Sequence, residues 1–233
     1  MSGRYEARFV ERERCASDVV SVRFTKPEGY TFIPGQWFRL SLDTAEGART
    51  ETFTHSSAPA DELIELTTRM SGSAFKNALG ALAAGDVVGM VGPGGHFTLP
   101  GGLARMAYLV GGTGITPVRS MLRDAVARGR VFEDALLLYG NRDSSCVPFE
   151  HEFAAMEGIG VRMVLCFEHP DSAWEGERGF ITADTVRRHL QLDDDRPFIV
   201  AGPPMMVSAM ERVLDDLGIP DSRRMIERYG PAI

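Results

Sequence analysis

The hydrophobic pattern of this chain changes once, near residue 102. Before that point, short segments in which apolar and polar side chains tend to alternate are separated by turns, at residues 19–24, 37–42, 63–68 and 86–91. Alternation with a period of two is typical of half-buried strands. After that point, continuous apolar runs follow one another with helical patterns between them, as in a parallel sheet covered on both faces. We therefore predict an antiparallel barrel or sandwich in residues 1–101 and an α/β domain with a parallel sheet in residues 102–233.

The positions of the helices follow from the same reading. One helix is expected within the barrel half at residues 74–82, where Phe75, Leu79 and Leu82 share a face and Ser73 is placed to cap the first turn. In the second half, strands are expected at residues 106–110, 135–139, 161–167 and 198–201. Helices are expected between and after them, at residues 117–128, 148–156, 182–190 and 205–217.

Composition and charge exclude several classes of protein. The 233 residues are 44% hydrophobic and 24% charged, as in ordinary globular proteins, and the net charge is -7. With no basic stripe, nucleic acid and anionic membranes are poor partners. No apolar run approaches the roughly 20 residues that span a bilayer, and the charged N-terminus does not resemble a secretory signal, so we expect a cytoplasmic protein without membrane insertion. The three cysteines are far apart, so no disulfide framework and no metal site is expected.

A glycine-rich turn follows the apolar run at residues 106–110. The turn reads Gly111-Gly112-Thr113-Gly114, and the helical pattern after it begins with Pro117. Such a turn lets backbone N–H groups approach a phosphate, and the helix N-terminus adds a favourable dipole. A tight turn without a ligand is the alternative. The spacing is not G-x-G-x-x-G, which excludes the ordinary dehydrogenase fingerprint.

A second unusual turn, Gly202-Pro203-Pro204-Met205, follows the last apolar strand. Ligands of open parallel sheets bind outside the carboxyl ends of the strands, where both glycine turns fall. Gly202 would let a flat ring lie against the backbone, and the prolines would hold the turn rigid. An ordinary turn between a strand and a helix is the alternative.

The barrel half contains two further candidate segments. In residues 51–59, an aromatic ring beside hydroxyl side chains offers a stacking face and hydrogen bonds for a planar heterocycle, although alone this pattern is also that of a strand with a polar face. In residues 69–77, the capped helix start with Lys76 in its first turn forms a second candidate anion site. Two anion sites on two domains indicate two nucleotides.

The order of these segments resembles the ferredoxin–NADP reductase-like superfamily, and the resemblance covers nearly the whole chain. Each motif alone is weak, but the ordered set is specific. The motifs are Pro34-Gly35-Gln36, Phe53-Thr54 with Ser57 and Pro59, Gly72-Ser73, Gly92-Pro93 with Gly95 and Phe97, Gly111-Gly112 with Gly114 and Pro117, Tyr139 to Arg142, Gly202 to Met205, and Glu227 to Tyr229.

The resemblance implies that residues 1–101 form an antiparallel Greek-key β-barrel that binds FAD, followed by a doubly wound α/β domain in residues 102–233. Phe53 would pack on the isoalloxazine and Thr54 would face the flavin N5 atom. Glu227 would reach toward the flavin and relay a proton, with a surface charge in the last strand as the alternative, and Tyr229 would cover the other flavin face. For His55, a hydrogen bond to the flavin or a phosphate and a solvent-facing strand position stay open. The other implied flavin contacts are Ser57, Arg69, Gly72, Ser73, Ala74, Phe75 and Lys76.

The resemblance also implies that the second domain binds NADH or NADPH. Arg142 could pair with a 2′-phosphate, whereas Asp143 would repel one and bind ribose hydroxyls, which slightly favours NADH. The turn at Gly202, Pro203, Pro204 and Met205 would shape the nicotinamide half of the site. The implied contacts to the rest of the nucleotide are Gly111, Gly112, Thr113, Gly114, Pro117, Asn141, Arg142 and Asp143.

Two positions depart from the pattern. Glu51 stands where the flavin motif normally has arginine, so a phosphate contact is missing or is supplied by Arg49, Arg69 or Lys76. Ala201 replaces the cysteine that precedes Gly-Pro-Pro in relatives, which leaves room for the nicotinamide.

The sequence thus predicts an enzyme, an FAD-containing NAD(P)H oxidoreductase. Hydride would pass from NAD(P)H to FAD N5, and electrons would then leave to a separate acceptor such as a ferredoxin, a flavodoxin or an oxygenase component. Two alternatives stay open: an electron-transfer subunit of a larger redox complex, and a reductase of free flavin. The oligomeric state is not indicated.

Overall fold

The computed structural model describes residues 2–99 and 101–229. The chain divides into two compact units. The first unit contains Met1–Leu99 and Thr116–Arg128, and the second contains Pro100–Ile115 and Gly129–Ile233. Residues 116–128 therefore group with the N-terminal unit. The expected division into two continuous segments at residue 102 places them in the second unit instead. We describe each unit by itself.

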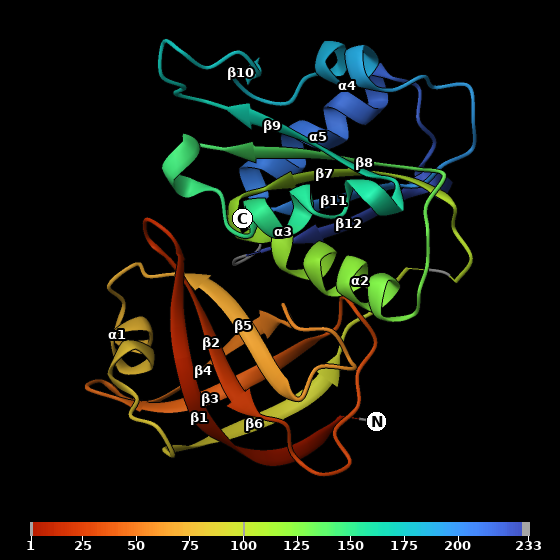
Figure 1. The fold of residues 1–233 in the computed structure, drawn as a ribbon. Helices are drawn as coiled ribbons and strands as arrows, with labels where there is room; N and C mark the ends of the chain where they lie inside the picture. The colour runs from red at the N-terminus through yellow and green to blue at the C-terminus, as the bar shows by residue number, and fades with distance from the viewer. Residues whose placement is uncertain (1, 100, 230–233) are drawn as a thin grey trace. The chain divides into compact units, whose positions relative to one another are not determined.

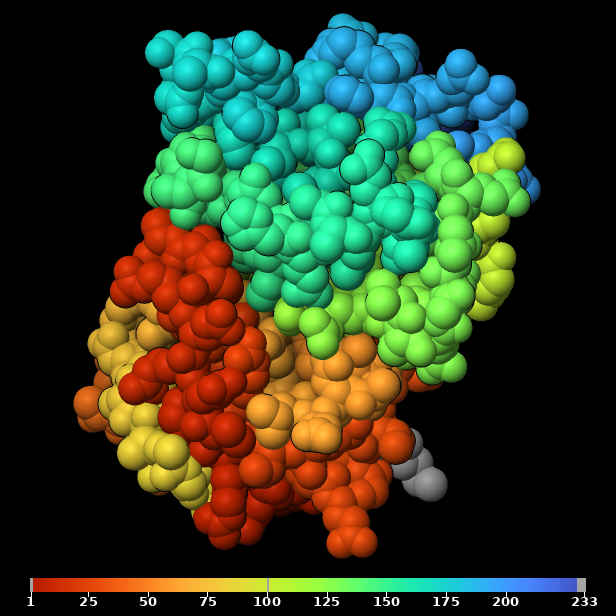
Figure 2. Space-filling model, viewed as in Figure 1, coloured from red at the N-terminus to blue at the C-terminus, as the bar shows by residue number. Residues whose placement is uncertain are grey.

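The first unit is built on a curled sheet of six antiparallel strands (Figure 1). Their order across the sheet is β4-β3-β6-β1-β2-β5. In the space-filling view the side chains over β1 and β2, in red, form a continuous outer layer (Figure 2). The strands are β1 (Gly3–Ala16), β2 (Val19–Thr25), β3 (Trp37–Thr44), β4 (Gly47–Thr54), β5 (Leu63–Arg69) and β6 (Val87–Gly94).

The two edges of the curled sheet approach each other just after β4. Ser56 donates its backbone N–H to the carbonyl of Glu65 in β5, at 2.9 Å. Inside the curl, side chains from all six strands and from helix α1 (Ala74–Ala81) form one hydrophobic core. Ser73 caps α1, because its side chain accepts a hydrogen bond from the backbone N–H of Lys76. The predicted barrel and its capped helix are confirmed.

The second unit is a sheet whose strands all pair in parallel (Figure 1). Its order is β10-β9-β8-β7-β11-β12. Helices α4 (Ala183–His189) and α5 (Pro204–Asp216) pack on one face, and α3 (Glu150–Ala154) contacts β9. The strands are β7 (Arg105–Gly111), β8 (Asp134–Asn141), β9 (Val161–Phe167), β10 (Glu177–Arg178), β11 (Phe198–Gly202) and β12 (Arg224–Arg228).

This sheet is buried on both faces, as the continuous apolar runs predict. Ala107, Leu136 and Val200 belong to the core under α4 and α5, whereas Tyr108 and Leu137, which point to the opposite face, are also fully buried. The carboxyl ends of β8, β7, β11 and β12 lie side by side in this order. Both glycine turns are therefore at one edge of the sheet.

The sequence left some elements unpredicted or misplaced. Strands β1 and β4 were not predicted, although Tyr5, Ala7 and Phe9 alternate with charged residues in β1. The helix expected at residues 148–156 is only α3, because Phe149 is left-handed (φ 62°) and a 3-10 turn at Glu157–Ile159 follows. Within the described residues, no helix is long and apolar enough to cross a membrane.

Candidate functional site

The glycine turn after β7 is held against the turn after β11. The turn forms the 3-10 helix η1 (Gly112–Gly114), which leads into α2 (Ile115–Ala127). A Cβ on Gly114 would overlap the backbone oxygen of Ala201, and a Cβ on Gly111 would overlap the Met206 sulfur. Gly112 has a φ of 52°, a conformation that side-chain-bearing residues rarely adopt. The glycines are thus required by close packing and by backbone shape, which leaves the loop's backbone exposed to a ligand only on its outer side.

Tyr139 fixes the same turn from the neighbouring strand β8. Its hydroxyl donates to the Gly112 carbonyl at 3.0 Å, and the side chain is fully buried. The bond pulls one carbonyl of the turn inward, toward the sheet. Sequence reasoning placed Tyr139 in a motif without giving it a role, since a tyrosine in an apolar strand reads as a core residue.

The turn after β11 relies on Met206, which was not predicted. Its sulfur lies over both glycine turns, because a Cβ on Gly202 would come within 2.7 Å of it. Met205, the predicted residue, points outward with 75% of its surface exposed. Pro203 and Pro204 start α5. The two adjacent methionines therefore differ in role: Met206 packs against the turn, and the exposed Met205 is accessible to a ligand.

Asn141 ends β8 with an unsatisfied amide. Within the described residues neither its Oδ1 nor its Nδ2 finds a hydrogen-bond partner, although the residue is only 9% exposed. A buried amide without partners costs free energy, so in a native protein such a group is commonly satisfied by a ligand or water. Asn141 lies beside the glycine turn, since Gly140 pairs with Gly111.

Arg142 and Asp143 follow Asn141 and pair with each other, Nε to Oδ2 at 3.0 Å. Asp143 also accepts hydrogen bonds from the backbone and hydroxyl of Ser145, and so caps the 3-10 helix η2 (Ser144–Cys146). Ser145 first and Arg142 second hold the pKa of Asp143 down, at about 2. The carboxylate is therefore charged at neutral pH and neutralises the nearest cation.

These observations fit a nicotinamide nucleotide. The glycine turn presents backbone to a phosphate, the start of α2 adds its dipole, and the orphaned Asn141 amide offers both a donor and an acceptor. Thr113 is half-buried within the turn, and Pro117 is buried in the first turn of α2. The predicted residues from β7, β8 and β11 are brought together at one edge, as expected.

In the barrel, His55 is a core residue, which corrects both expectations for it. It is fully buried, with its ring stacked on Phe32 at 3.7 Å between centroids. Nδ1 donates to the Gln36 carbonyl at 2.6 Å, and Nε2 accepts from the Tyr30 hydroxyl at 2.8 Å. Burial lowers the pKa of His55 to about 3, so the ring is neutral. With both nitrogens used, it has nothing to offer a flavin, and it does not face solvent.

The serines after His55 are tied to a buried carboxylate, Glu65. Ser56 donates its hydroxyl to Glu65 Oε1 at 2.8 Å, and Ser57 Oγ accepts from the Glu65 backbone N–H at 3.0 Å. Arg119, from α2, bonds to the same carboxylate and to the Ser56 carbonyl. Ser120 donates to the Ser57 carbonyl at 2.7 Å. The network fixes the backbone of this segment; neither Arg119 nor Glu65 was predicted, because the two lie 54 residues apart.

Phe53 and Thr54 end β4 as buried residues, 8% and 5% exposed. The Phe53 ring packs against Phe38 and Phe75, and the Lys76 ammonium lies 4.2 Å from its centroid. The expected stacking face of Phe53 is therefore covered by protein side chains in this structure.

The three basic side chains predicted near the flavin phosphates all pair with acidic side chains. Lys76 pairs with Glu51 at 2.7 Å. Arg69 pairs with Asp18 at 3.0 Å, and Arg49 with Glu46 at 3.5 Å. At the start of α1, Gly72 has a φ of 76° and its carbonyl accepts from the Asn77 side chain. Ser73, Ala74 and Phe75 form the capped first turn with Lys76.

Two predicted residues lie on or just after the last strand of the sheet. Glu227 in β12 lies opposite Ala201 in the register and is half-buried. Burial raises the pKa of its carboxyl group. Tyr229 donates its backbone N–H to the Gly202 carbonyl at 3.0 Å, which extends the pairing with β11. Ala201 is fully buried, with its carbonyl against Gly114.

The barrel residues fit a flavin in part. Phe53, Thr54 and Ser57 gather at the end of β4, as a flavin ring requires, and α1 begins with a capped turn. The residues expected to bind the flavin phosphates fit less well, because the buried cation Lys76 already forms an ion pair with a carboxylate.

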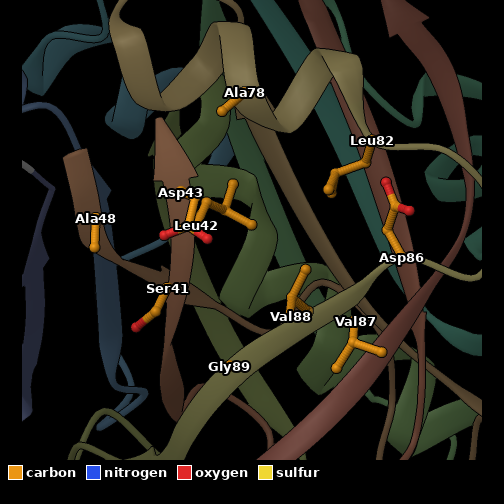
Figure 3. A pocket seen from close by; sticks show the side chains of 10 residues that line it. All are labelled: Ser41, Leu42, Asp43, Ala48, Ala78, Leu82, Asp86, Val87, Val88 and Gly89. Atoms are coloured by element: carbon orange, nitrogen blue, oxygen red, sulfur yellow. The ribbon is translucent and has the colours of Figure 1, made fainter. Parts of the chain in front are cut away.

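A shallow hollow on the barrel lies apart from these residues. It is lined by Ala78 and Leu82 of α1 and by parts of β3, β4 and β6 (Figure 3). It contains none of the predicted site residues. Among the described residues, no group of three or more metal-ligating side chains converges.

Comparisons with known proteins agree with this geometry. Residues 108–212 match the family model of the oxidoreductase NAD-binding domain. The chain is 29% identical to ferredoxin–NADP reductase B of Sorangium cellulosum over 97% of each chain. It is 28% identical to the flavohemoprotein of Pseudomonas putida, over 99% of this chain and 60% of that protein.

Solved structures show the same fold. The cytochrome b5 reductase domain of Ulva prolifera nitrate reductase superposes with a TM-score of 0.84, at 22% identity and 97% coverage of both chains. A ferredoxin NADP+ reductase from Neisseria gonorrhoeae, with bound FAD and NADP, gives a TM-score of 0.83 at 20% identity, covering 97% of this chain and 98% of that one. Together with the shared fold, these comparisons support the ferredoxin–NADP reductase-like superfamily of FAD- and NAD(P)-binding oxidoreductases as the family that this chain resembles.

Proposed function

We propose that this protein is an FAD-dependent NAD(P)H reductase that passes electrons to a separate acceptor protein. The observation that carries the proposal is the edge of the parallel sheet, where the packed glycine turn after β7 lies beside the unsatisfied amide of Asn141. We place the protein in the cytoplasm, which its three free cysteines support. The superfamily relationship and the 29% identity to a ferredoxin–NADP reductase over nearly the full length support the choice of reaction.

On the nucleotide side, the turn at Gly111–Gly114 would bind phosphate through its backbone. Tyr139 keeps the Gly112 carbonyl turned inward, so that N–H groups and not a carbonyl meet the anion. Gly202 and the exposed Met205 would receive the nicotinamide end. Met206 keeps the two turns in register by packing on both.

On the flavin side, a bound FAD supplies the redox chemistry, since it accepts hydride at N5 and releases electrons to an acceptor. Thr54 and Ser57 would hydrogen-bond the ring and the ribityl chain, and Phe53 would contact the ring once Lys76 moves away. The Glu65–Arg119 network holds the Ser57 backbone in place. Glu227, whose pKa burial raises, would hold the proton that accompanies reduction.

We propose NADH as the preferred donor, because Asp143 neutralises Arg142 at the strand end where an adenine ribose is expected. Replacing Asp143 by Asn keeps a cap for Ser145 but removes the charge. The ratio of kcat/KM for NADPH to that for NADH should then rise about tenfold, because the Arg142 charge, no longer neutralised by Asp143, attracts a 2′-phosphate. An unchanged ratio in steady-state kinetics would contradict the assignment.

An anaerobic titration tests the function itself. FAD-loaded protein is mixed with NADH and, in a separate sample, with NADPH, while the flavin absorbance is followed. Rapid bleaching by either nucleotide supports the reductase. Bound flavin that neither nucleotide bleaches would instead support an electron-transfer subunit. Turnover that requires an excess of free flavin would support a flavin reductase.

A further inference from the structure

The partly buried ion pair between Glu51 and Lys76 lies at the proposed flavin segment. The Lys76 ammonium donates to Glu51 Oε2 at 2.7 Å, and the two side chains are 36% and 11% exposed, respectively for Glu51 and Lys76. The same ammonium lies 4.2 Å from the centre of the Phe53 ring and 5.4 Å from that of Phe75. Lys76 is thus bound at once by a carboxylate and by two aromatic faces.

The surroundings give an incoming phosphate little free positive charge. Arg49 and Arg69, the other two cations expected near the phosphates, have Glu46 and Asp18 as partners. Both arginines are more than half exposed, so water screens them, whereas Lys76 is buried. Lys76 is therefore the cation with the greatest effect on a bound anion, and Glu51 cancels it.

A phosphate at Lys76 competes with Glu51 for the ammonium group, and to take its full charge the phosphate must separate the pair. The carboxylate would then be left partly buried beside a second negative group, and the cost of separating the pair would offset the new contact. A flavin ring or a ribityl chain carries no such charge, and its binding requires only that the lysine move off Phe53. The ion pair therefore weakens the binding of phosphate groups and not the binding of the flavin ring.

We propose that the Glu51–Lys76 pair determines the specificity of the flavin site by withholding the lysine charge from the phosphates. Binding then depends on the ring and ribityl chain, and FAD, FMN and riboflavin bind with similar affinity and exchange. This inference rests on the proposed function, and it specifies how that function's cofactor is held.

The test is a set of flavin affinities measured on the full chain after removal of flavin, by quenching of flavin fluorescence. The unmodified protein should bind FAD, FMN and riboflavin with dissociation constants within about tenfold of one another. Glu51→Gln should tighten FAD and FMN by about tenfold and leave riboflavin unchanged, since only the phosphates sense the freed charge. Adding Lys76→Met to Glu51→Gln should abolish this gain.

The matched control is Glu46→Gln, which removes the same charge from the exposed partner of Arg49 and should move no affinity. Binding of FAD by the unmodified protein about a hundredfold tighter than riboflavin would overturn the inference while leaving the reductase intact. Equal shifts of all three flavins in Glu51→Gln would also overturn it. Failure to bind any flavin would reject the proposed function together with the inference.

Discussion

Two fully buried tyrosines on adjacent strands show how one hydroxyl group separates a core residue from a site residue. Tyr139 in β8 donates to the carbonyl of Gly112 at 3.0 Å, whereas the hydroxyl of Tyr108 in β7 donates to the sulfur of Met106 at 3.2 Å. Both side chains are equally buried. They differ in that one orients the turn at which we expect the phosphate.

Tyr139→Phe should therefore weaken nucleotide binding with little effect on the reaction that follows. Losing one hydrogen bond costs about 1 kcal/mol, so the dissociation constant for NADH should rise about fivefold. Titration of the protein with NADH measures this directly. Tyr108→Phe is the control and should leave the constant unchanged; equal effects of the two changes would mean that the Gly112 bond does not matter for the ligand.

Glu227 gives a prediction about pH. Because burial raises the pKa of its carboxyl group, the folded protein holds this proton to a higher pH than the unfolded chain does. The group therefore costs no stability below its unfolded pKa of about 4.3, and its cost appears as pH rises through the folded pKa. Glu227→Gln should raise the midpoint of urea unfolding at pH 7 and not at about pH 4. An equal rise at both values would exclude deprotonation as the cause.

At the scale of elements, α2 follows the glycine turn in sequence and groups with the barrel unit. It starts at the glycine turn, yet its side chains bond to the barrel: Arg119 to Glu65, Ser120 to the Ser57 carbonyl, and Arg123 to Asp61. Arg119 and Glu65 are nearly inaccessible, at 7% and 5% side-chain exposure, while Arg123 is 35% exposed. The same helix therefore makes one deeply buried ion pair and one near the surface.

These two pairs should differ greatly in their effect on stability. Arg119→Met takes the buried guanidinium away from the Glu65 carboxylate, which keeps Arg23 and the Ser56 hydroxyl, so the free energy of unfolding should fall by about 3 kcal/mol. Arg123→Met breaks an accessible pair and should cost less than about 1 kcal/mol. Urea unfolding of both variants checks the prediction. Equal, small losses would show that the Arg119 pair is offset by its own desolvation.

The elements themselves were largely predictable, because local periodicity encodes them. The apolar runs of β7, β8, β9 and β11 and the cap of α1 follow from neighbouring residues alone. The partners of α2 do not, since Arg119 and Glu65 are distant in sequence and each resembles a surface charge. His55 was misread for a similar reason: its hydrogen-bond partners, Tyr30 and Gln36, come from other segments. The glycine turns could therefore be predicted from the sequence, whereas the side chains that fix them in place could not.

For the whole molecule, the two units have separate hydrophobic cores, one inside the curled sheet and one under α4 and α5. Residues 116–128 follow the glycine turn in sequence but group with the barrel. A chain with two cores need not unfold in a single step. The position of α2 then determines which core loses stability when the ion pair between Arg119 and Glu65 is removed.

The two tryptophans allow this to be measured, since Trp37 is in the barrel unit and Trp174 in the α/β unit. Trp174→Phe leaves a fluorescence reporter of the barrel, and Trp37→Phe leaves one of the α/β unit. Adding Arg119→Met should lower the urea midpoint seen by Trp37 and leave that seen by Trp174 in place, because Glu65, which loses a buried cation, lies in β5 of the barrel unit. If both midpoints fall together, the two units unfold as one cooperative body, and α2 stabilises the whole chain and not the barrel alone.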